Sequence, residues 1–311
     1  MIKVITDVEV PKRSSLGGKA FSLCTLSKEG INIPKGFIVT CEAFFRYLEY
    51  NCIRDKIEKL SSEINRENLQ EKVKAIYTLT QNKEMPPEIS QEIHDHLKLL
   101  NNKAVAIRSS AVSEDSAKSS FAGMHDTFLN IKPDLSSIIK NIKRCMLSLF
   151  SERAVTYRLI KKLGLIEGIA VIVQEMIPAQ AAGITFTVHP MIKECMLIEA
   201  SYGIGELIVS GKIEPDAYTI KRGSFKILNK TVGLKDKMCI VDNSGCKTIA
   251  VKKDMIDKDA LKANEIEKIS KECFKIENIF KGPQDIEWCI LNNRIWILQS
   301  RIIKEVMKYG V

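Results

Sequence analysis

The residues suited to chemistry in this sequence are charged groups beside glycine turns and strand ends. Gly17 and Gly18 precede Lys19, and Ala20 to Glu29 follow with the pattern of a helix. Two glycines let backbone amides turn toward an anion, a helix N-terminus adds positive potential, and the lysine adds a full charge. The pattern predicts a phosphate cradle. A plain turn before a helix is the alternative, because the triplet is not the longer G-x-x-x-x-G-K-[ST] motif.

A second candidate is Arg108, which follows the apolar strand Ala104 to Ile107. An arginine at a strand end can project its planar fork into a cleft and bind a phosphate through two hydrogen bonds. The residues from Ala111 to Gly123 are almost all small and polar, which predicts a lid over about residues 109–123. A surface arginine and a disordered loop tip are the alternatives.

A third candidate is the strand-turn-strand pattern near the C-terminal end of the chain. A two-residue turn at Asn292 and Asn293 would pair Glu287 with Leu298, which mixes polar and apolar groups on both faces. A loop one residue longer pairs Glu287 with Gln299 instead and separates the two kinds of side chain. We therefore expect the longer loop.

In that register, one face of the hairpin gathers Asp285, Glu287, Gln299 and Arg301. The opposite, inward face is expected to hold the apolar residues Ile286, Trp288, Ile290, Trp296 and Leu298. Carboxylate and amide oxygens coordinate a hard cation, and an arginine contacts phosphate oxygens. The face thus predicts a site for a magnesium-bound polyphosphate. A solvent-facing sheet surface with an exposed ion pair is the alternative.

Other patterns favour structural roles. The turn Gly203 to Gly205 lacks the third glycine of a dinucleotide fingerprint, since Ile208 stands there. It predicts a close approach of the backbone to another part of the chain or to a ligand. The 4 histidines are expected to be structural, and a phosphorylated nucleophile or an acid-base group among them is the alternative. The 9 cysteines are scattered without C-x-x-C spacing, so neither a disulfide framework nor a zinc site is expected.

Composition bounds the class of protein. The chain has 311 residues, of which 45% are hydrophobic, enough for about two globular lobes. No apolar run is long enough to cross a membrane, and no signal peptide begins the chain, so a cytoplasmic protein is expected. Lysine and arginine number 47 against 38 acidic residues, but they are scattered beside acids, which argues against nucleic-acid binding.

The order of elements predicts an α+β fold. The first half is helical, with a strand at Ile33 to Thr40, a helix capped by Thr40, and another helix opened by Pro86 and Pro87. After Gly168, short β-branched runs predict a mixed sheet, interrupted by one helix over about Lys258 to Phe280. We expect an N-terminal lobe over residues 1–178 and a C-terminal lobe over residues 179–311.

Taken together, the chain resembles the N-terminal ATP-grasp domain of the phosphoenolpyruvate synthase, pyruvate phosphate dikinase and rifampicin phosphotransferase family. The resemblance spans nearly the whole chain. It rests on LGGKAFSL, IPKGFIVT, VAIRSSAVSED, SFAGMHDTFLN, SLFSERAVTYR, VIVQEMI, AGITFTVHP, EASYGIGE, EPDAY, DIEW and ILQSR, in that order. Two small departures are Glu214, where asparagine is common, and Ile302, where a proline often stands.

The resemblance implies a two-lobed ATP-grasp fold that binds ATP and Mg²⁺. Catalytic roles fall to Lys19, Arg108 and Arg301. Lys19 and Arg108 would contact phosphates, and Arg301 would stabilise the transferred phosphoryl group. The remaining nucleotide contacts implied are Gly123 and Thr127 at the lid, Gln174 and Met176 around adenine, Glu199 at the ribose, and Glu287 and Gln299 on the metal.

In this family a histidine on a swivelling domain attacks the β-phosphorus, which leads to AMP and phosphate. No such domain is recognisable before Val311, so the resemblance implies a separate partner protein that carries the histidine. A self-contained kinase that releases ADP and a non-catalytic nucleotide sensor are the alternatives. The final phosphoryl acceptor and the oligomeric state are not predicted.

Overall fold

The structure is a computed structural model that describes residues 1–303 apart from 102, 115–125, 162, 165 and 243–244. The chain forms two compact units. Unit 1 comprises Met1–Thr25 and Lys35–Met176, and unit 2 comprises Leu26–Pro34 and Ile177–Val311. The segment Leu26–Pro34 therefore belongs with the C-terminal part of the chain, which a single boundary near Pro178 does not describe.

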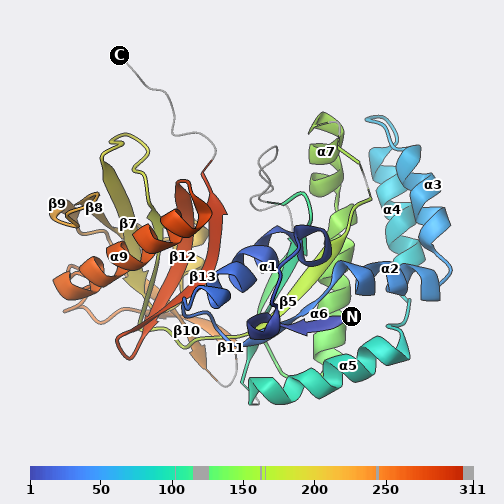
Figure 1. The fold of residues 1–311 in the computed structure, drawn as a ribbon, viewed down its shortest axis with the longest axis horizontal. Helices are drawn as coiled ribbons and strands as arrows, with labels where there is room; N and C mark the ends of the chain where they lie inside the picture. The colour runs from blue at the N-terminus through green and yellow to red at the C-terminus, as the bar shows by residue number, and fades with distance from the viewer. Residues whose placement is uncertain (102, 115–125, 162, 165, 243–244, 304–311) are drawn as a thin grey trace. The chain divides into compact units, whose positions relative to one another are not determined.

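Unit 1 combines helices with a five-stranded sheet (Figure 1). Its strands are β1 (Ile2–Val4), β2 (Gly36–Val39), β3 (Val105–Ala111), β4 (Thr127–Ile131) and β5 (Ile169–Glu175). Its α-helices are α1 (Arg13–Lys28), which continues into unit 2, α2 (Cys41–Tyr50), α3 (Arg54–Ser62), α4 (Leu69–Thr80), α5 (Pro87–Leu97), α6 (Leu135–Leu147) and α7 (Glu152–Lys161). Short 3-10 turns lie at Ile5–Asp7, Lys98–Leu100 and Ser148–Phe150.

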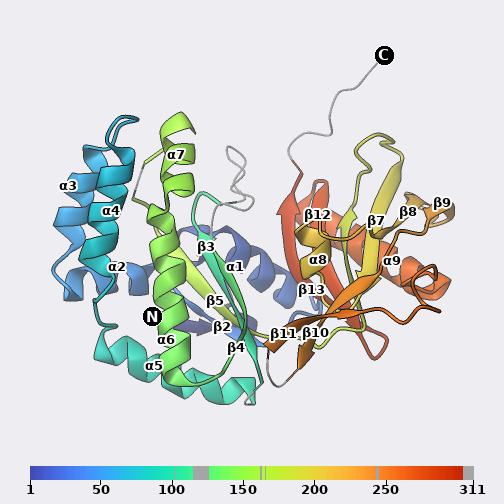
Figure 2. The ribbon, with the colours of Figure 1, turned by 180° about the vertical axis from the view of Figure 1, so that it is seen from behind.

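The sheet of unit 1 has the strand order β1-β2-β5-β3-β4, and its strand pairs are antiparallel. One face forms the core with α2 and α6, whereas α1 begins on the other face, as the front and back views show (Figures 1 and 2). Ile169 to Val173 are fully buried because both faces are covered. The core face holds Phe37, Val39, Val105, Ile107, Val171 and Val173, which pack with Phe44, Tyr47, Ile138 and Ile142 of the helices.

Unit 2 is built on a six-stranded sheet in the order β13-β12-β6-β7-β8-β9. These strands are β6 (Ala181–Phe186), β7 (Cys195–Tyr202), β8 (Asp216–Lys221), β9 (Ile227–Thr231), β12 (Gln284–Leu291) and β13 (Arg294–Ile302). A separate two-stranded hairpin, β10 (Lys237–Asp242) with β11 (Gly245–Ala250), was not predicted. The helices are α8 (Glu206–Val209) and α9 (Ala263–Phe280).

The content of helices and sheets confirms the predicted α+β class. The sheet of unit 2, expected to be mixed, is antiparallel in its described pairs. Helix α9 begins at Ala263, later than predicted, because the Glu265 carboxylate accepts a hydrogen bond from the Lys262 backbone amide at 2.7 Å and so caps the helix there. Its buried residues include Cys273, whose thiol is hydrogen-bonded to Thr185 of β6. Helix α9 therefore covers the sheet face that holds Thr185.

The hairpin of β12 and β13 corrects the predicted loop and confirms the predicted pairing. Asn292 and Asn293 form a two-residue turn with φ of 52° and 60°, the left-handed values of a type I′ turn. The three-residue loop was therefore wrong. A β-bulge between Glu287 and Trp288 leaves Leu298 as the extra residue, and beyond it Glu287 pairs with Gln299, and Asp285 with Arg301, as predicted.

The same bulge changes which side chains share a face. Trp288 pairs with Ile297, and both are buried, whereas Cys289 pairs with Trp296. Trp296 and Leu298 pack against a small cluster around Cys289, on the face opposite Trp288. The prediction that Trp296 and Leu298 lie with Trp288 was wrong, because the two-residue turn shifts the near half of β13 by one residue.

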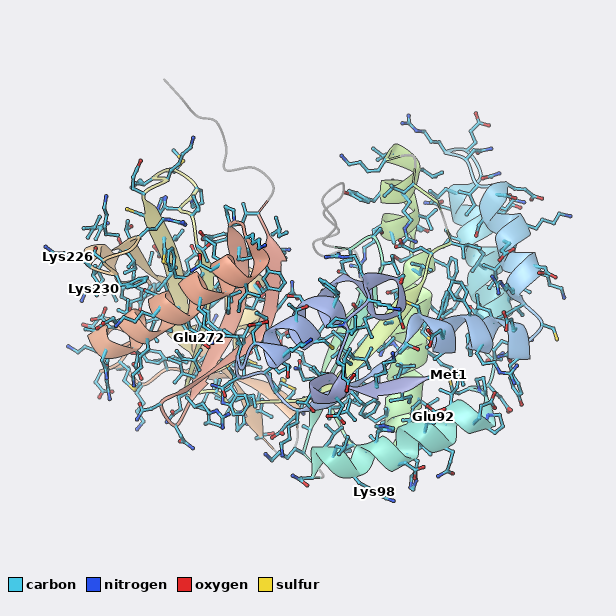
Figure 3. The ribbon with its side chains drawn as sticks, in the orientation of Figure 1. Met1, Glu92, Lys98, Lys226, Lys230 and Glu272 are labelled. Atoms are coloured by element: carbon cyan, nitrogen blue, oxygen red, sulfur yellow. The ribbon has the colours of Figure 1, made fainter. Side chains whose placement is uncertain are left out.

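Local contacts fix the N-terminal end of the first strand. The amino group of Met1 lies 3.0 Å from a carboxylate oxygen of Glu92 on α5, and both residues are labelled in Figure 3. Thr40 is the N-cap residue of α2, but its side chain does not cap the helix as predicted; the hydroxyl donates to the Met1 carbonyl at 2.9 Å. Pro87 opens α5 as predicted.

The segment Leu26–Pro34 is bonded to β13 within unit 2. The Ile297 amide donates to the Asn32 carbonyl at 2.9 Å, and Arg294 donates to the Asn32 side chain at 2.5 Å. The first bond satisfies one backbone amide on the outer edge of β13, and the segment covers part of that edge. Among the described residues, no helix has the length and apolar character needed to cross a membrane.

A buried ion pair connects β8 to two loops of unit 2. Asp216, in the EPDAY segment, and Lys235 are both 0% exposed and in contact. The Asp216 carboxylate also accepts from the Gly233 amide at 3.0 Å and the Ala260 amide at 2.7 Å. One carboxylate thus ties β8 to two separate loops, and its removal leaves a buried ammonium without its counter-charge.

We predict that Asp216→Asn lowers the free energy of unfolding by about 3–5 kcal/mol, because breaking a buried pair costs the desolvation of the remaining charge. Urea unfolding measures the loss. The double variant Asp216→Asn with Lys235→Met should recover much of it. Glu267→Gln, which breaks the exposed pair with Lys271, is the control and should unfold like the wild type. Equal stability of the Asp216 variant and this control would contradict the prediction.

Candidate functional site

The glycine turn of unit 1 lies directly against the end of β3. Gly17 has φ of 72° and interrupts α1, and a Cβ added there would lie 1.8 Å from the Ser110 carbonyl oxygen. A Cβ on Gly18 would lie 2.0 Å from the Glu114 carbonyl oxygen. Both positions therefore need glycine for a backbone-to-backbone approach, and Gly17 also for its left-handed φ.

Hydrogen bonds hold the second part of α1 in the same place. The Ser110 hydroxyl accepts from the Ala20 amide at 3.0 Å and donates to the Leu16 carbonyl at 2.8 Å. The serine thus satisfies backbone groups on both sides of the interruption. Ser110 is therefore a structural connector between β3 and the glycine turn, a role that the sequence did not reveal.

Lys19 is positioned by these contacts and by a carboxylate. Its ammonium lies 2.7 Å from Glu114 and donates to the Ser109 carbonyl at 3.3 Å. The Lys19 side chain is 12% exposed and that of Glu114 is 3% exposed. Arg13 donates to the Glu114 carbonyl at 2.8 Å, which fixes the same loop. Glu114 is a site residue that sequence reasoning missed; the only signal was its place shortly after Arg108.

The strand register of unit 1 places three predicted residues on one face of the sheet. Arg108 pairs with Thr127 of β4 on one side and with Ile172 of β5 on the other. Ala106 pairs with Gln174, so Gln174 shares the face of Arg108, two residues along the strand. Ser110, which binds α1, lies on this face too. The phosphate-binding candidates of unit 1 are therefore brought together on the face where α1 begins.

Met176 lies just beyond β5. Its amide donates to the Ala104 carbonyl at 2.9 Å, and its sulfur accepts from the Asn130 amide at 2.8 Å. Met176 and Gln174 are 9% and 2% exposed. Residues 115–123 of the predicted lid, Gly123 among them, lie outside the described residues.

The sheet face of unit 2 opposite α9 carries the other predicted side chains. Glu199 pairs with Ile184, Ile184 with Glu287, and Glu287 with Gln299, so these residues form one row across four strands. Neighbours in such a row share a face. Asp285 and Arg301 follow in the adjacent row, as predicted.

The electrostatics of this face favour a cation. Burial, and next the charge of Asp285, raise the pKa of Glu199 above its ordinary value. Arg301 donates to Asp285 from Nε at 2.7 Å and approaches it with Nη2 at 2.5 Å, so one guanidinium offsets part of the negative charge. Glu287 and Gln299, the predicted metal residues, add oxygen atoms to the same face, and oxygen is the type of ligand that Mg²⁺ prefers.

Other singled-out residues have structural contacts. Gly203 has φ of 73°, and a Cβ there would lie 2.2 Å from the Cys239 carbonyl, so the predicted close backbone approach is confirmed. His189 accepts at Nδ1 from the amides of Met191 and Ile192, and His96 bonds the Glu92 carbonyl.

Unit 1 gathers Lys19 and Arg108, and unit 2 gathers acidic and amide side chains beside Arg301. These two sets of side chains make the chain a candidate nucleotide-binding domain. The family model described as "Pyruvate phosphate dikinase, AMP/ATP-binding domain" matches residues 13–309. The chain belongs to this family, which confirms the resemblance found in the sequence.

Named relatives agree with this assignment. A "Probable phosphoenolpyruvate synthase" of Methanocaldococcus jannaschii is 32% identical over 94% of this chain and 26% of its own length. The "Rifampicin phosphotransferase" of Bacillus subtilis is 33% identical over 96% of this chain and 35% of its own length. The chain thus spans about a quarter to a third of these relatives. A solved D-alanine–D-alanine ligase from Bacillus anthracis covers 91% of this chain and 55% of its own, at 7% identity and a TM-score of 0.34, too weak to bear on the site.

We predict that Gly17→Ala lowers the free energy of unfolding by at least ~3 kcal/mol, because the new methyl group collides with the backbone of β3. Gly30→Ala is the matched control: Gly30 has a similar φ of 73° but open space around it. The control should cost only the ~1 kcal/mol of an unfavourable φ. Urea unfolding of both variants makes the comparison, and equal losses would show that the close approach to Ser110 is unimportant.

A second prediction concerns Glu199. Its folded-state pKa is raised, so the folded state binds its proton more tightly, and stability falls as pH rises from its unfolded value, near 4.5, through the folded value. Glu199→Gln removes this loss and should raise the melting temperature at neutral pH in the absence of divalent cations. Thermal melts from about pH 4 to about pH 8, a range that begins near the unfolded pKa, test it, with exposed Glu267→Gln as the control. A Glu199→Gln profile parallel to the wild type would contradict the assignment.

Proposed function

We propose that this chain binds ATP with Mg²⁺ and takes part in phosphoryl transfer. The observation that carries the proposal is the row of Glu199, Glu287 and Gln299, with Arg301 anchored beside it, on one sheet face of a member of the pyruvate phosphate dikinase AMP/ATP-binding family. An oxygen-rich face with an adjacent guanidinium suits a metal-bound polyphosphate better than either an apolar ligand or a nucleic acid.

In unit 1, we assign phosphate contacts to Lys19 and Arg108. Lys19 supplies a point charge whose position is set by Glu114 and the Ser109 carbonyl, and Arg108 supplies the planar fork. Thr127, opposite Arg108 in the sheet, and Gly123 are assigned to the lid over the phosphates. The Lys19–Glu114 contact means that a phosphate must share the ammonium with a buried carboxylate, which keeps the cation in place when no nucleotide is bound.

We assign the adenine to Gln174 and Met176. Gln174 offers amide hydrogen-bonding groups, and the Met176 side chain offers an apolar, polarisable surface suited to a flat ring. In unit 2, Glu199 is assigned to the ribose end, where a carboxylate accepts hydrogen bonds from hydroxyl groups.

The donor set of unit 2 fits Mg²⁺. Glu287 contributes a carboxylate and Gln299 an amide oxygen. Burial, and next the charge of Asp285, raise the pKa of the neighbouring Glu199, and a bound cation would favour its ionised form. When bound, the cation would neutralise charge on the phosphates. Arg301, held by Asp285, is assigned to stabilise charge on the transferred phosphoryl group.

We infer a histidine of a separate partner protein as the acceptor. The relatives carry the names phosphoenolpyruvate synthase and rifampicin phosphotransferase, and His96 and His189 of this chain are used in local hydrogen bonds. In the dikinase route the histidine nitrogen attacks the β-phosphorus, the bond to the α-phosphate oxygen breaks, and AMP leaves. Transfer of the terminal phosphoryl group to water then gives phosphate. Such ATP-dependent transfer is expected in the cytoplasm.

The test is titration of ATP into the full chain by calorimetry, with and without Mg²⁺, followed by analysis of the products. Arg108→Lys keeps the charge but loses the fork, so we expect at least a ~10-fold weaker affinity, about 1.4 kcal/mol. Glu287→Gln should abolish the enhancement by Mg²⁺ and leave metal-free binding unchanged. Exposed Lys98→Ala and Glu267→Gln are the controls for the two units and should bind like the wild type.

The products separate the three candidate activities. With MgATP and a protein that carries a phosphohistidine domain, AMP and phosphate should appear, and neither should appear with Glu287→Gln. Formation of ADP without a partner would replace the proposal by a self-contained kinase. Binding without any turnover would leave a nucleotide sensor.

A further inference from the structure

Unit 2 contains a second group of metal-ligating side chains, none of which is assigned to ATP. Glu206 is the first residue of α8, and Cys239 and Cys246 lie on β10 and β11. A carboxylate oxygen and the two sulfurs all lie within 4.8 Å of one another. Two thiols and a carboxylate that converge on one point form a candidate metal site whose ligands differ from the oxygen ligands assigned to Mg²⁺.

Backbone contacts hold the three side chains together. The Ile204 amide donates to the Cys239 carbonyl at 2.8 Å, and Gly203 approaches the same carbonyl so closely that a Cβ there would lie 2.2 Å from it. This turn leads directly into α8, so the position of Glu206 is tied to the backbone of Cys239. The site is therefore positioned by the backbone before any ligand arrives, which is what tight metal binding needs.

The hairpin register puts both thiols on one face. Cys239 pairs with Thr248 and Cys246 with Val241, so the two cysteines are diagonal neighbours. Their sulfurs are within hydrogen-bonding reach of each other. In a tetrahedral zinc site with Zn–S bonds of about 2.3 Å, two sulfurs lie ~3.8 Å apart, so little side-chain rotation is needed.

A disulfide fits this register less well. The Cβ atoms of diagonal partners are typically somewhat under ~7–8 Å apart, whereas a disulfide needs about 3.5–4.5 Å. Bridging the cysteines directly would therefore require the strands to shift, whereas a metal spans the gap between the sulfurs.

The surroundings determine the kind of metal. Cys239 is 4% exposed, Cys246 is half-buried and Glu206 is exposed, so the site opens to solvent on the side of the carboxylate. Sulfur ligands favour borderline or soft metals and disfavour Mg²⁺.

We propose that Glu206, Cys239 and Cys246 bind one Zn²⁺ ion, with water in the fourth position. Each thiol loses its proton to solvent on binding, and the metal gains two sulfur ligands and one oxygen ligand. The ion joins the β10–β11 hairpin to the turn that follows β7, the strand that carries Glu199. The site is independent of the proposed Mg²⁺ site, whose ligands are oxygen atoms and include no thiol.

The test uses the full chain, reduced and stripped of metal, and titrated with Co²⁺ as a spectroscopic stand-in for Zn²⁺. One equivalent should produce thiolate-to-cobalt charge-transfer absorption and the intense ligand-field bands of tetrahedral coordination. Zn²⁺ should then bleach both. A spectrum of octahedral cobalt without the charge-transfer band would overturn the proposal.

Variants assign the signal to these residues. Cys246→Ser should weaken Zn²⁺ binding by more than the ~10–100-fold typical of an outer ligand. Glu206→Gln should weaken it less and alter the ligand-field bands. Cys52→Ser, which removes an exposed thiol in unit 1, is the matched control and should bind like the wild type. Because Cys239→Ser can destabilise a buried position, the half-buried Cys246 variant is the deciding one.

Two outcomes contradict the proposal. Unchanged zinc affinity in Cys246→Ser would place the metal elsewhere. A mass two hydrogens lower for the metal-free chain in air, with peptides that link Cys239 to Cys246 and no zinc uptake after reduction, would identify a disulfide pair instead. Failure of ATP binding does not affect this test, since the cobalt spectrum requires no nucleotide.

Discussion

The register of one hairpin decides which side chains face the same way in unit 2. The two-residue turn at Asn292 and Asn293 alone would pair Glu287 with Leu298 and leave Gln299 on the wrong face. The bulge at Leu298 restores the offset, and Gln299 and Arg301 then lie opposite Glu287 and Asp285. Bulges beside functional sites commonly serve to re-aim a side chain in this way. The row from Glu199 to Gln299 thus depends on one unpaired residue.

Unit 1 relies on a different constraint, the close contact of two backbones. The glycine turn of α1 can approach β3 only because Gly17 and Gly18 have no side chains, and Ser110 satisfies the amide and carbonyl groups that the interruption exposes. Lys19 is then held by Glu114 and Ser109. In unit 1 a close backbone contact fixes the position of the charged side chains. In unit 2 the strand register fixes it.

Much of this could be predicted from the sequence, and the failures have physical causes. Alternation along β12 and β13 predicted the pairing of Glu287 with Gln299, but not the turn, because a two-residue turn with a bulge and a three-residue loop give the same distal register. Glu114 was missed because a salt bridge between Lys19 and a loop leaves no periodic signal. The cysteine pair was missed because zinc motifs are recognised by short spacing, whereas Cys239 and Cys246 meet Glu206 only after a hairpin forms. The roles proposed for the site residues draw on family membership, because the geometry of each unit does not specify them.

The assignment of Leu26–Pro34 to unit 2 has a consequence for dissection of the protein. A fragment that starts at Ile177 lacks Asn32, whose carbonyl and side chain bond Ile297 and Arg294 on the edge strand. Such a fragment would expose that edge to other chains and would be prone to self-association. Neither half is a contiguous gene segment, so an isolated C-terminal half needs the nine-residue peptide grafted back, for example ahead of β6 through a flexible linker.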